Sequence, residues 1–151
     1  MLTLPLLLLG ASPLRGQDEG GADAAAAATD TVDEAAAVEA ASAAALQWLA
    51  IVDGGDYEAS WEAAAPALKD ALAATQWAAA LGQARGPLEP FGDRERISAR
   101  YTTELPNAPA GEYVVLQYRT AVSGDRTVVE TVVPMKVDGA WKVSGYFVRP
   151  E

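Results

Sequence analysis

The sequence predicts an α+β fold in which about three helices pack on a curved sheet of four antiparallel strands. Residues 112–149 alternate in character and are rich in Val, Thr and Tyr, which favour strands. Turn residues divide this region at 123–125 and at Asp138-Gly139, and an Asp-Gly pair between apolar runs is a strong hairpin signal. Residues 31–85 show helical spacing instead, and helices followed by strands are typical of α+β folds.

Side chains along a strand point alternately to the two faces of the sheet. The residues predicted to face the helices are Val114, Leu116, Tyr118, Thr120, Val129, Thr131, Val133, Met135, Val137, Trp141, Val143, Gly145 and Phe147. The opposite, outer face also contains apolar residues, namely Tyr113, Val115, Val132, Tyr146 and Val148. Because large apolar surfaces are rarely left open to water, we expect this face to be covered. A homodimer formed through it, and cover by the N-terminal arm or the turns, explain the pattern equally well.

Residues 97–105 alternate cleanly and predict the first strand. The basic residues with the parity of the outer face are Arg94, Arg96, Arg100 and Arg119. They indicate either a basic patch that suits an acidic partner or, as the favoured interpretation, a solvated strand face. Pro134 has no amide hydrogen, so we expect a bulge or an unpaired edge at that position.

The first helix is predicted to begin at Thr31, because residues 31–34 match a capping box in which the Thr and Glu side chains bond each other's backbone amides. Its apolar face consists of Val38, Ala41, Ala45, Leu49 and Val52. Asp56 is expected to cap a second helix that breaks near Pro66, and Thr75 a third.

The chain is expected to contain three segments. Residues 1–16 resemble the apolar core of a secretory signal peptide, residues 17–30 form an acidic linker rich in Ala and Gly, and residues 31–151 form a single α+β domain. The apolar run is far shorter than the roughly 20 residues that span a bilayer, so no membrane span is expected in the mature chain. We therefore expect a periplasmic or extracellular protein. A disordered apolar N-terminus on a cytosolic protein is the alternative.

The charge of the chain disfavours nucleic acid as a partner. It carries 21 acidic and 11 basic residues, a formal net charge of −10, whereas nucleic-acid binding needs a basic face. The chain also has no Cys and no His, which removes thiolate chemistry, the commonest general base and the commonest metal ligand. No catalytic residue, cofactor or metal site is predicted.

An acidic cluster surrounds the glycines at 54–55. It consists of Asp53, Asp56, Glu58 and Glu62. A calcium site is one interpretation, but the spacing does not fit an EF-hand loop. Capping and first-turn positions explain the same residues, and we favour this second interpretation.

The large aromatic residues suggest an apolar cavity. The expected lining residues for a small apolar ligand are Trp48, Trp61, Tyr101, Tyr118 and Trp141. Aromatic side chains dominate core burial in most domains, so a purely structural role is the favoured alternative.

Residues 45–148 resemble the bacterial family catalogued as domain of unknown function 4019. The resemblance rests on ALQWLAIVDGGDYEASWEAAAP, QWAAALGQARGPL, AGEYVVLQYRT and DGAWKVSGYFV, in this order. It implies an exported bacterial protein with helices on a curved antiparallel sheet, similar to the nuclear-transport-factor-2-like or cystatin-like shape. It implies no activity, and no site residue carries over.

Three functions remain open. The leading hypothesis is a non-catalytic, exported module that binds a small ligand or a protein. The second is a small enzyme that uses a carboxylate or a tyrosine as general acid-base, although the strand positions predicted to face the interior carry no Asp or Glu. The third is a structural component of the cell envelope.

Overall fold

The computed structural model describes the backbone of residues 19–151 and the side chains of residues 33–151. The predicted signal-like segment, residues 1–16, lies outside the described residues. The chain divides into two compact units, residues 1–33 and residues 34–151.

The described part of the first unit is helical. It forms the beginning of α1 (Glu19–Asp53), which continues into the second unit. The helix start predicted at Thr31 is therefore wrong, because α1 already runs through this position. The five alanines at 24–28 account for this, since Ala has the highest helix propensity of all residues.

The second unit contains the rest of α1 and the helices α2 (Tyr57–Glu62), α3 (Pro66–Ala71), α4 (Ala74–Arg85) and η1 (Gly86–Leu88). The predicted break near Pro66 separates α2 from α3 completely, so there are more helices than expected. Asp56 caps α2 as predicted, since its Oδ1 accepts a hydrogen bond of 3.0 Å from the amide of Ala59. Thr75 does not cap α4, which begins one residue earlier.

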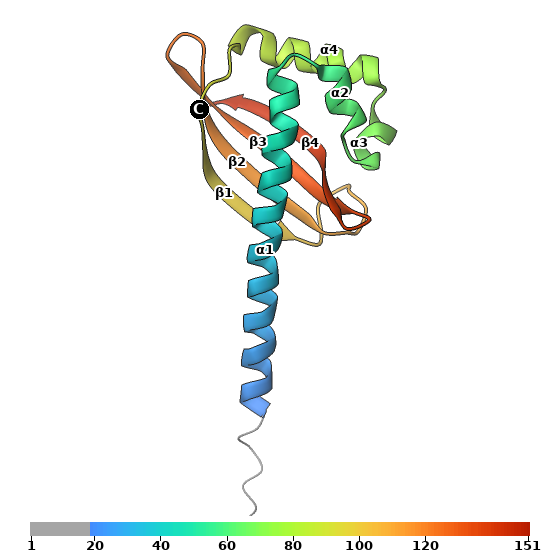
Figure 1. The fold of residues 1–151 in the computed structure, drawn as a ribbon, viewed down its shortest axis with the longest axis vertical. Coiled ribbons are helices and arrows are strands. Elements are labelled where there is room, and N and C mark those ends of the chain that lie inside the picture. The colour runs from blue at the N-terminus through green and yellow to red at the C-terminus, as the bar shows by residue number, and fades with distance from the viewer. Residues whose placement is uncertain (1–18) are drawn as a thin grey trace, which may run out of the picture. The chain divides into compact units, whose positions relative to one another are not determined.

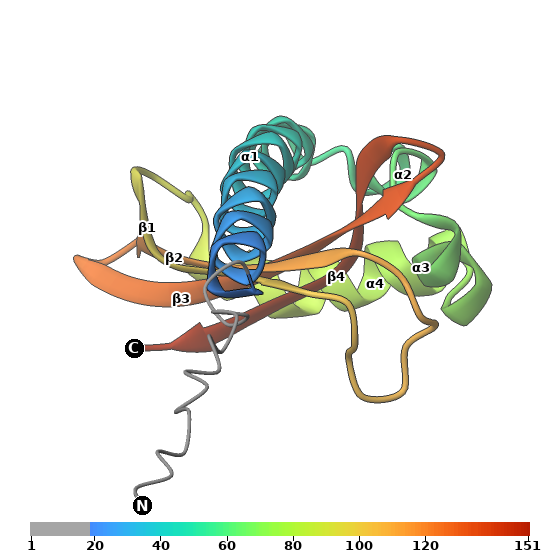
Figure 2. The ribbon, with the colours of Figure 1, turned by 90° about the horizontal axis from the view of Figure 1, so that it is seen from below.

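Four antiparallel strands follow, which confirms the predicted sheet. They are β1 (Arg94–Thr102), β2 (Tyr113–Val122), β3 (Arg126–Val137) and β4 (Ala140–Pro150), in the order β1-β2-β3-β4. The predicted turn between β3 and β4 has φ of 50° at Asp138 and 82° at Gly139. Within this unit, α1 crosses one face of the twisted sheet, and α2, α3 and α4 gather near β4 (Figure 1, Figure 2).

A bulge in β1 corrects the predicted place of two arginines. Arg96 pairs with Tyr118 and Ser98 pairs with Gln117, so Ile97 is an extra residue that reverses the alternation. Arg94 and Arg96 therefore face the helices instead of the outer side. Arg96 donates a 2.7 Å hydrogen bond to Ser42 of α1.

A second bulge lies beside Pro134, as predicted. Pro134 pairs with Val143 and Val133 pairs with Gly145, which leaves Ser144 as the extra residue of β4. The alternation of β4 is reversed beyond this point. Phe147, which was predicted to face the core, is therefore 66% exposed.

The predicted faces of β3 and of the second half of β4 are wrong. Val132 and Tyr146 belong to the buried core, and Val148 packs against it, although all were assigned to the outer face. Both faces of β3 carry valines, so the hydrophobic pattern alone does not determine its orientation. Tyr113 does lie on the outer face, but it is buried and its hydroxyl donates to the carbonyl of Pro109 at 2.6 Å.

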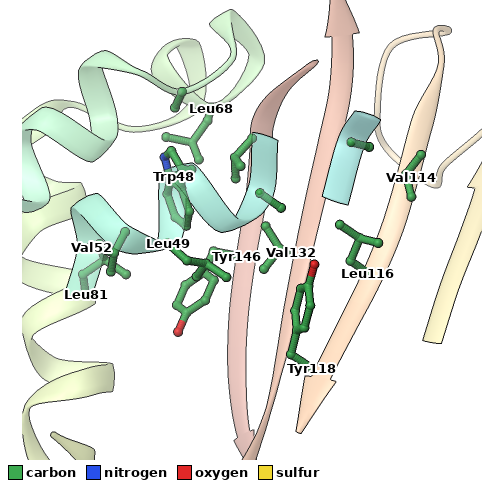
Figure 3. Close-up of a cluster of buried hydrophobic side chains, with 14 of the residues drawn as sticks. Trp48, Leu49, Val52, Leu68, Leu81, Val114, Leu116, Tyr118, Val132 and Tyr146 are labelled. Atoms are coloured by element: carbon green, nitrogen blue, oxygen red, sulfur yellow. The ribbon is translucent and has the colours of Figure 1, made fainter. Parts of the chain in front are cut away.

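The core joins α1 to the sheet and to α4 (Figure 3). The predicted apolar face of α1 is confirmed, because Ala41, Ala45, Leu49 and Val52 are fully buried and Val38 packs beside them. Within the described chain, one segment, Asp33–Asp53, is long and apolar enough to cross a membrane, a criterion that core helices and signal sequences also meet.

Candidate functional site

Four charged side chains from four elements form a network at one end of the core, which we call the ionic cluster: Asp53, Arg85, Arg94 and Glu130. Arg94 binds both Asp53 oxygens, with its Nη1 2.6 Å from Oδ2 and its Nη2 2.9 Å from Oδ1. It also binds both oxygens of Glu130, from Nε at 3.1 Å and from Nη2 at 3.0 Å. Glu130 is fully buried, so Arg94 neutralises a carboxylate that has no access to water.

Arg85 connects the ionic cluster to β4. It is fully buried, its Nη2 lies 2.5 Å from Asp53 Oδ1, and its Nη1 donates to the hydroxyl of Tyr146 at 2.8 Å. Its guanidinium lies 3.6 Å from the ring centre of Phe91, a cation–π arrangement. Two arginines and two carboxylates give the ionic cluster a formal charge of zero, so it behaves as a crosslink between α1, α4, β1, β3 and β4.

The pKa shifts of Asp53 and of two neighbouring tyrosines do not suit proton transfer near neutral pH. Burial by itself would raise the pKa of the Asp53 carboxyl, but the hydrogen bonds and charges of Arg94 and then Arg85 outweigh it and hold the pKa below its usual range. Burial also raises the pKa of Tyr146, and the charge of Glu130 adds to this effect. Burial raises the pKa of Tyr118 as well. A general acid-base needs a pKa near the operating pH, and these shifts move away from it.

The depressed pKa of Asp53 predicts a pH dependence of stability. Asp53 has a lower pKa in the folded than in the unfolded protein, so its contribution is present above the unfolded value of about 3.9 and is lost as the pH falls through the folded value. We expect Asp53→Asn to lower the melting temperature at neutral pH and to differ progressively less from the parent protein below about pH 4. Thermal unfolding, followed by circular dichroism at a series of pH values from neutral to below about pH 4, measures the difference in melting temperature between the two proteins. Melting curves displaced equally at every pH would contradict the assignment.

A groove lies between α1, the C-terminal end of α2 at Ala63, and the start of β4 beside the β3–β4 turn, and we call it the α1–hairpin groove. Its volume is about 240 Å³, and its lining consists of Ala44, Gln47, Trp48, Ile51, Ala63, Ala140, Trp141, Lys142 and Val143. The lining is mainly apolar, with the exposed side chain of Lys142 as its charged member. Such a surface suits an apolar side chain of a binding partner.

The structure brings together two of the five residues predicted to line a cavity, Trp48 and Trp141, in the α1–hairpin groove. Trp61 lies beside the core and its Nε1 donates to the carbonyl of Leu72 at 2.8 Å.

The two predicted tyrosines lie away from this groove. The Tyr101 hydroxyl donates to Glu112 at 3.0 Å, at the opposite end of the same strand pair from Arg94. Tyr118 is buried next to Glu130 in the strand register. The ligand-binding role of all five aromatic residues stays a prediction.

In the acidic cluster predicted around the glycines, Asp56 caps α2 and Glu58 lies in its first turn, as the favoured interpretation expected. Asp53 instead binds the two arginines. Among the described residues, no group of His, Cys, Asp and Glu side chains could hold a metal ion. Sequence reasoning missed Arg85 and Glu130. Glu130 carried a signal, because it stands between the valine pairs 128–129 and 132–133 of a strand. Arg85 carried none, since a basic residue in the last turn of a helix is ordinary.

Comparison with known proteins places the chain in one family. Residues 44–146 match the model of the family described as "Protein of unknown function (DUF4019)", so the chain belongs to this family. No curated protein matches the chain. No solved structure matches it either.

Proposed function

We propose that this domain is a non-catalytic interaction module of an exported bacterial protein, and that the α1–hairpin groove receives an apolar side chain of a protein partner. The observation that carries this proposal is the groove itself, in which Trp48 and Trp141 line a mainly apolar surface. Aromatic residues are enriched at the centres of protein interfaces.

The size of the groove favours a protein partner over a small molecule. Its volume of about 240 Å³ lies below the range of about 300–1,000 Å³ that is typical of small-ligand pockets. One or two apolar side chains fill such a space, and the rest of an interface can then spread over the surrounding surface. Lys142, for which the described residues provide no ion-pair partner, is available to a carboxylate at the rim.

The alternatives have less support. An enzyme that uses a carboxylate or tyrosine has little support from Asp53, which is held ionised, or from Tyr146 beside the ionic cluster, which is held protonated. A structural envelope role needs no groove. Export rests on the signal-like apolar run of residues 1–16. The nuclear-transport-factor-2-like or cystatin-like shape remains part of this proposal.

The homodimer through the outer sheet face also remains a proposal, with a corrected set of residues. The larger apolar residues on that face are Tyr113, Val115, Val129, Val133, Met135, Val137 and Phe147. Val129 and Val133 are already buried within the single chain, so less apolar area is open there than the sequence suggests.

Photo-crosslinking in the native host tests the groove. A photoreactive amino acid at Gln47 or Ala63, two exposed groove positions, is expected to give an adduct with one defined protein. The same amino acid at Asp125, in the exposed β2–β3 turn, is expected to give none. Adding Ala63→Leu, which fills the groove, should remove the Gln47 adduct, whereas Ala43→Leu on the exposed side of α1 should not. An adduct of equal yield from Asp125, or one insensitive to Ala63→Leu, would refute the proposal.

A further inference from the structure

The two edges of the sheet differ in how they are protected. The β1 edge carries Glu95, Arg96 and Arg100 and has the bulge at Ile97 in its middle. Charged residues and bulges are the usual devices that prevent an edge strand from pairing with another chain. The β4 edge has no charged residue in the stretch 144–148.

The backbone of this β4 stretch is unpaired on the side away from β3. The amide of Ala65 donates to the carbonyl of Val143 at 2.8 Å, so the α2–α3 connection covers the edge at that residue. Beyond it, no backbone hydrogen bond among the described residues reaches 144–150 from another element on this outer side. The edge therefore presents a row of free donors and acceptors, since half of the backbone groups of an edge strand point away from the sheet.

An apolar groove runs beside the same stretch. This α4–β4 groove has a volume of about 250 Å³, and it is lined by Trp77, Ala80, Leu81, Ala84, Tyr146, Phe147 and Val148. Ala80 and Ala84 are exposed and lie one helical turn apart on α4, where their small side chains leave the space open. Phe147 is the most exposed of the large apolar residues of the described chain, at 66%.

We propose that the β4 edge binds an extended segment of another protein, which adds to the sheet as a fifth strand and places an apolar side chain in the α4–β4 groove. In this mode the backbone supplies affinity and alternate side chains supply specificity. The segment has apolar residues at alternate positions, because successive side chains of a strand point to opposite faces. The inference goes beyond the proposed function, since it uses a different surface from the α1–hairpin groove.

The occupant is a partner protein rather than a second copy of this chain. A formal net charge of −10 on each copy opposes the association of two copies, at this edge as well as through the outer sheet face. The free row also ends at Arg149, whose exposed guanidinium has a 3.4 Å hydrogen bond to the neighbouring Pro150 carbonyl and an electrostatic interaction with the Glu151 carboxylate. A partner with an acidic residue at the corresponding end of its strand would complement Arg149.

Selection from a library of displayed linear peptides against the purified protein tests this inference. Selected peptides are expected to alternate apolar and polar residues, and to slow the hydrogen exchange of amides within 144–149. Two versions of the best peptide carry N-methyl groups on one or on the other set of alternate residues. The version that is methylated on the amides that pair with β4 should lose binding and the other should retain it, because only backbone pairing is sensitive to the position of the methyl groups. Failure to select a peptide, or binding that both N-methylated versions retain, would overturn the proposal.

Matched variants on α4 locate the side-chain contact. Ala84→Leu fills the α4–β4 groove and should weaken peptide binding by about tenfold or more. Ala79→Leu, at an exposed position of the same helix outside the groove, should leave binding unchanged. Equal effects of the two variants would overturn the proposal. So would a dimer of the full chain that Phe147→Glu dissociates, because it would identify the occupant as a second copy.

Discussion

Arg94→Ala is expected to destabilise the protein by about 3–5 kcal/mol, because it leaves the fully buried carboxylate of Glu130 without its cation. The side chain of Arg94 holds four hydrogen bonds to two carboxylates, and Asp53 alone retains a second arginine, Arg85. Urea denaturation of the parent and the variant measures the difference in free energy of unfolding.

Two further variants distinguish the loss of the pair from the loss of packing. Replacing both partners, Arg94→Met with Glu130→Met, should be less damaging than Arg94→Ala, because no unpaired charge is then buried. Arg119→Ala should have little effect, since Arg119 and its partners Glu95 and Glu151 lie at the surface. A cost below about 1 kcal/mol for Arg94→Ala would contradict a buried, tightly held pair.

Trp48→Ala is expected to cost about 3–5 kcal/mol, the range for deletion of a large buried aromatic side chain. Trp48 is 4% exposed, and its ring centre lies 6.1 Å from that of Trp77 and 5.6 Å from that of Tyr146. Its Nε1 donates at 2.8 Å to the carbonyl of buried Ser60, whose hydroxyl accepts from Trp77 Nε1 at 3.0 Å. Removing the indole therefore loses packing and also leaves a buried carbonyl without this donor.

Trp61→Ala provides the matched control for this prediction. Trp61 is only half-buried at the margin of the core, so the same substitution removes less buried area and should cost clearly less. Trp48→Phe should have a free energy of unfolding between those of the parent and Trp48→Ala. It should lose about 1–3 kcal/mol relative to the parent, because the carbonyl of Ser60 is left unpaired. Thermal or urea unfolding of the three variants gives the order. Equal destabilisation by Trp48→Ala and Trp61→Ala would show that burial does not govern these two sites.

The fold class was predictable because its signals are local. The Asp138-Gly139 turn requires positive φ at both residues, and the structure has it. The apolar spacing of α1 placed Ala41, Ala45 and Leu49 in the core. The alternation also identified the inner face of β2, because Val114, Leu116, Tyr118 and Thr120 are all buried.

The orientation of β1 and of the second half of β4 was not predictable, because single inserted residues determine it, and that of β3 was hidden because both of its faces carry valines. Ile97 and Ser144 each reverse the alternation of a strand, and the sequence marks only the second bulge, through Pro134. The partners of a buried charge are equally hidden. Arg85 and Arg94 lie far from Asp53 in the chain, and Glu130 lies far from Arg94, so only the fold brings the four together.

Native mass spectrometry of the protein purified from the envelope fraction of its own host tests the proposed interaction module most directly. We expect the parent protein and Ala43→Leu to carry one additional protein chain in a fixed ratio, and Ala63→Leu, with the α1–hairpin groove filled, to appear without it. A bare parent chain, a bound small molecule in place of a protein, or the same bound chain on all three proteins would contradict the proposed function.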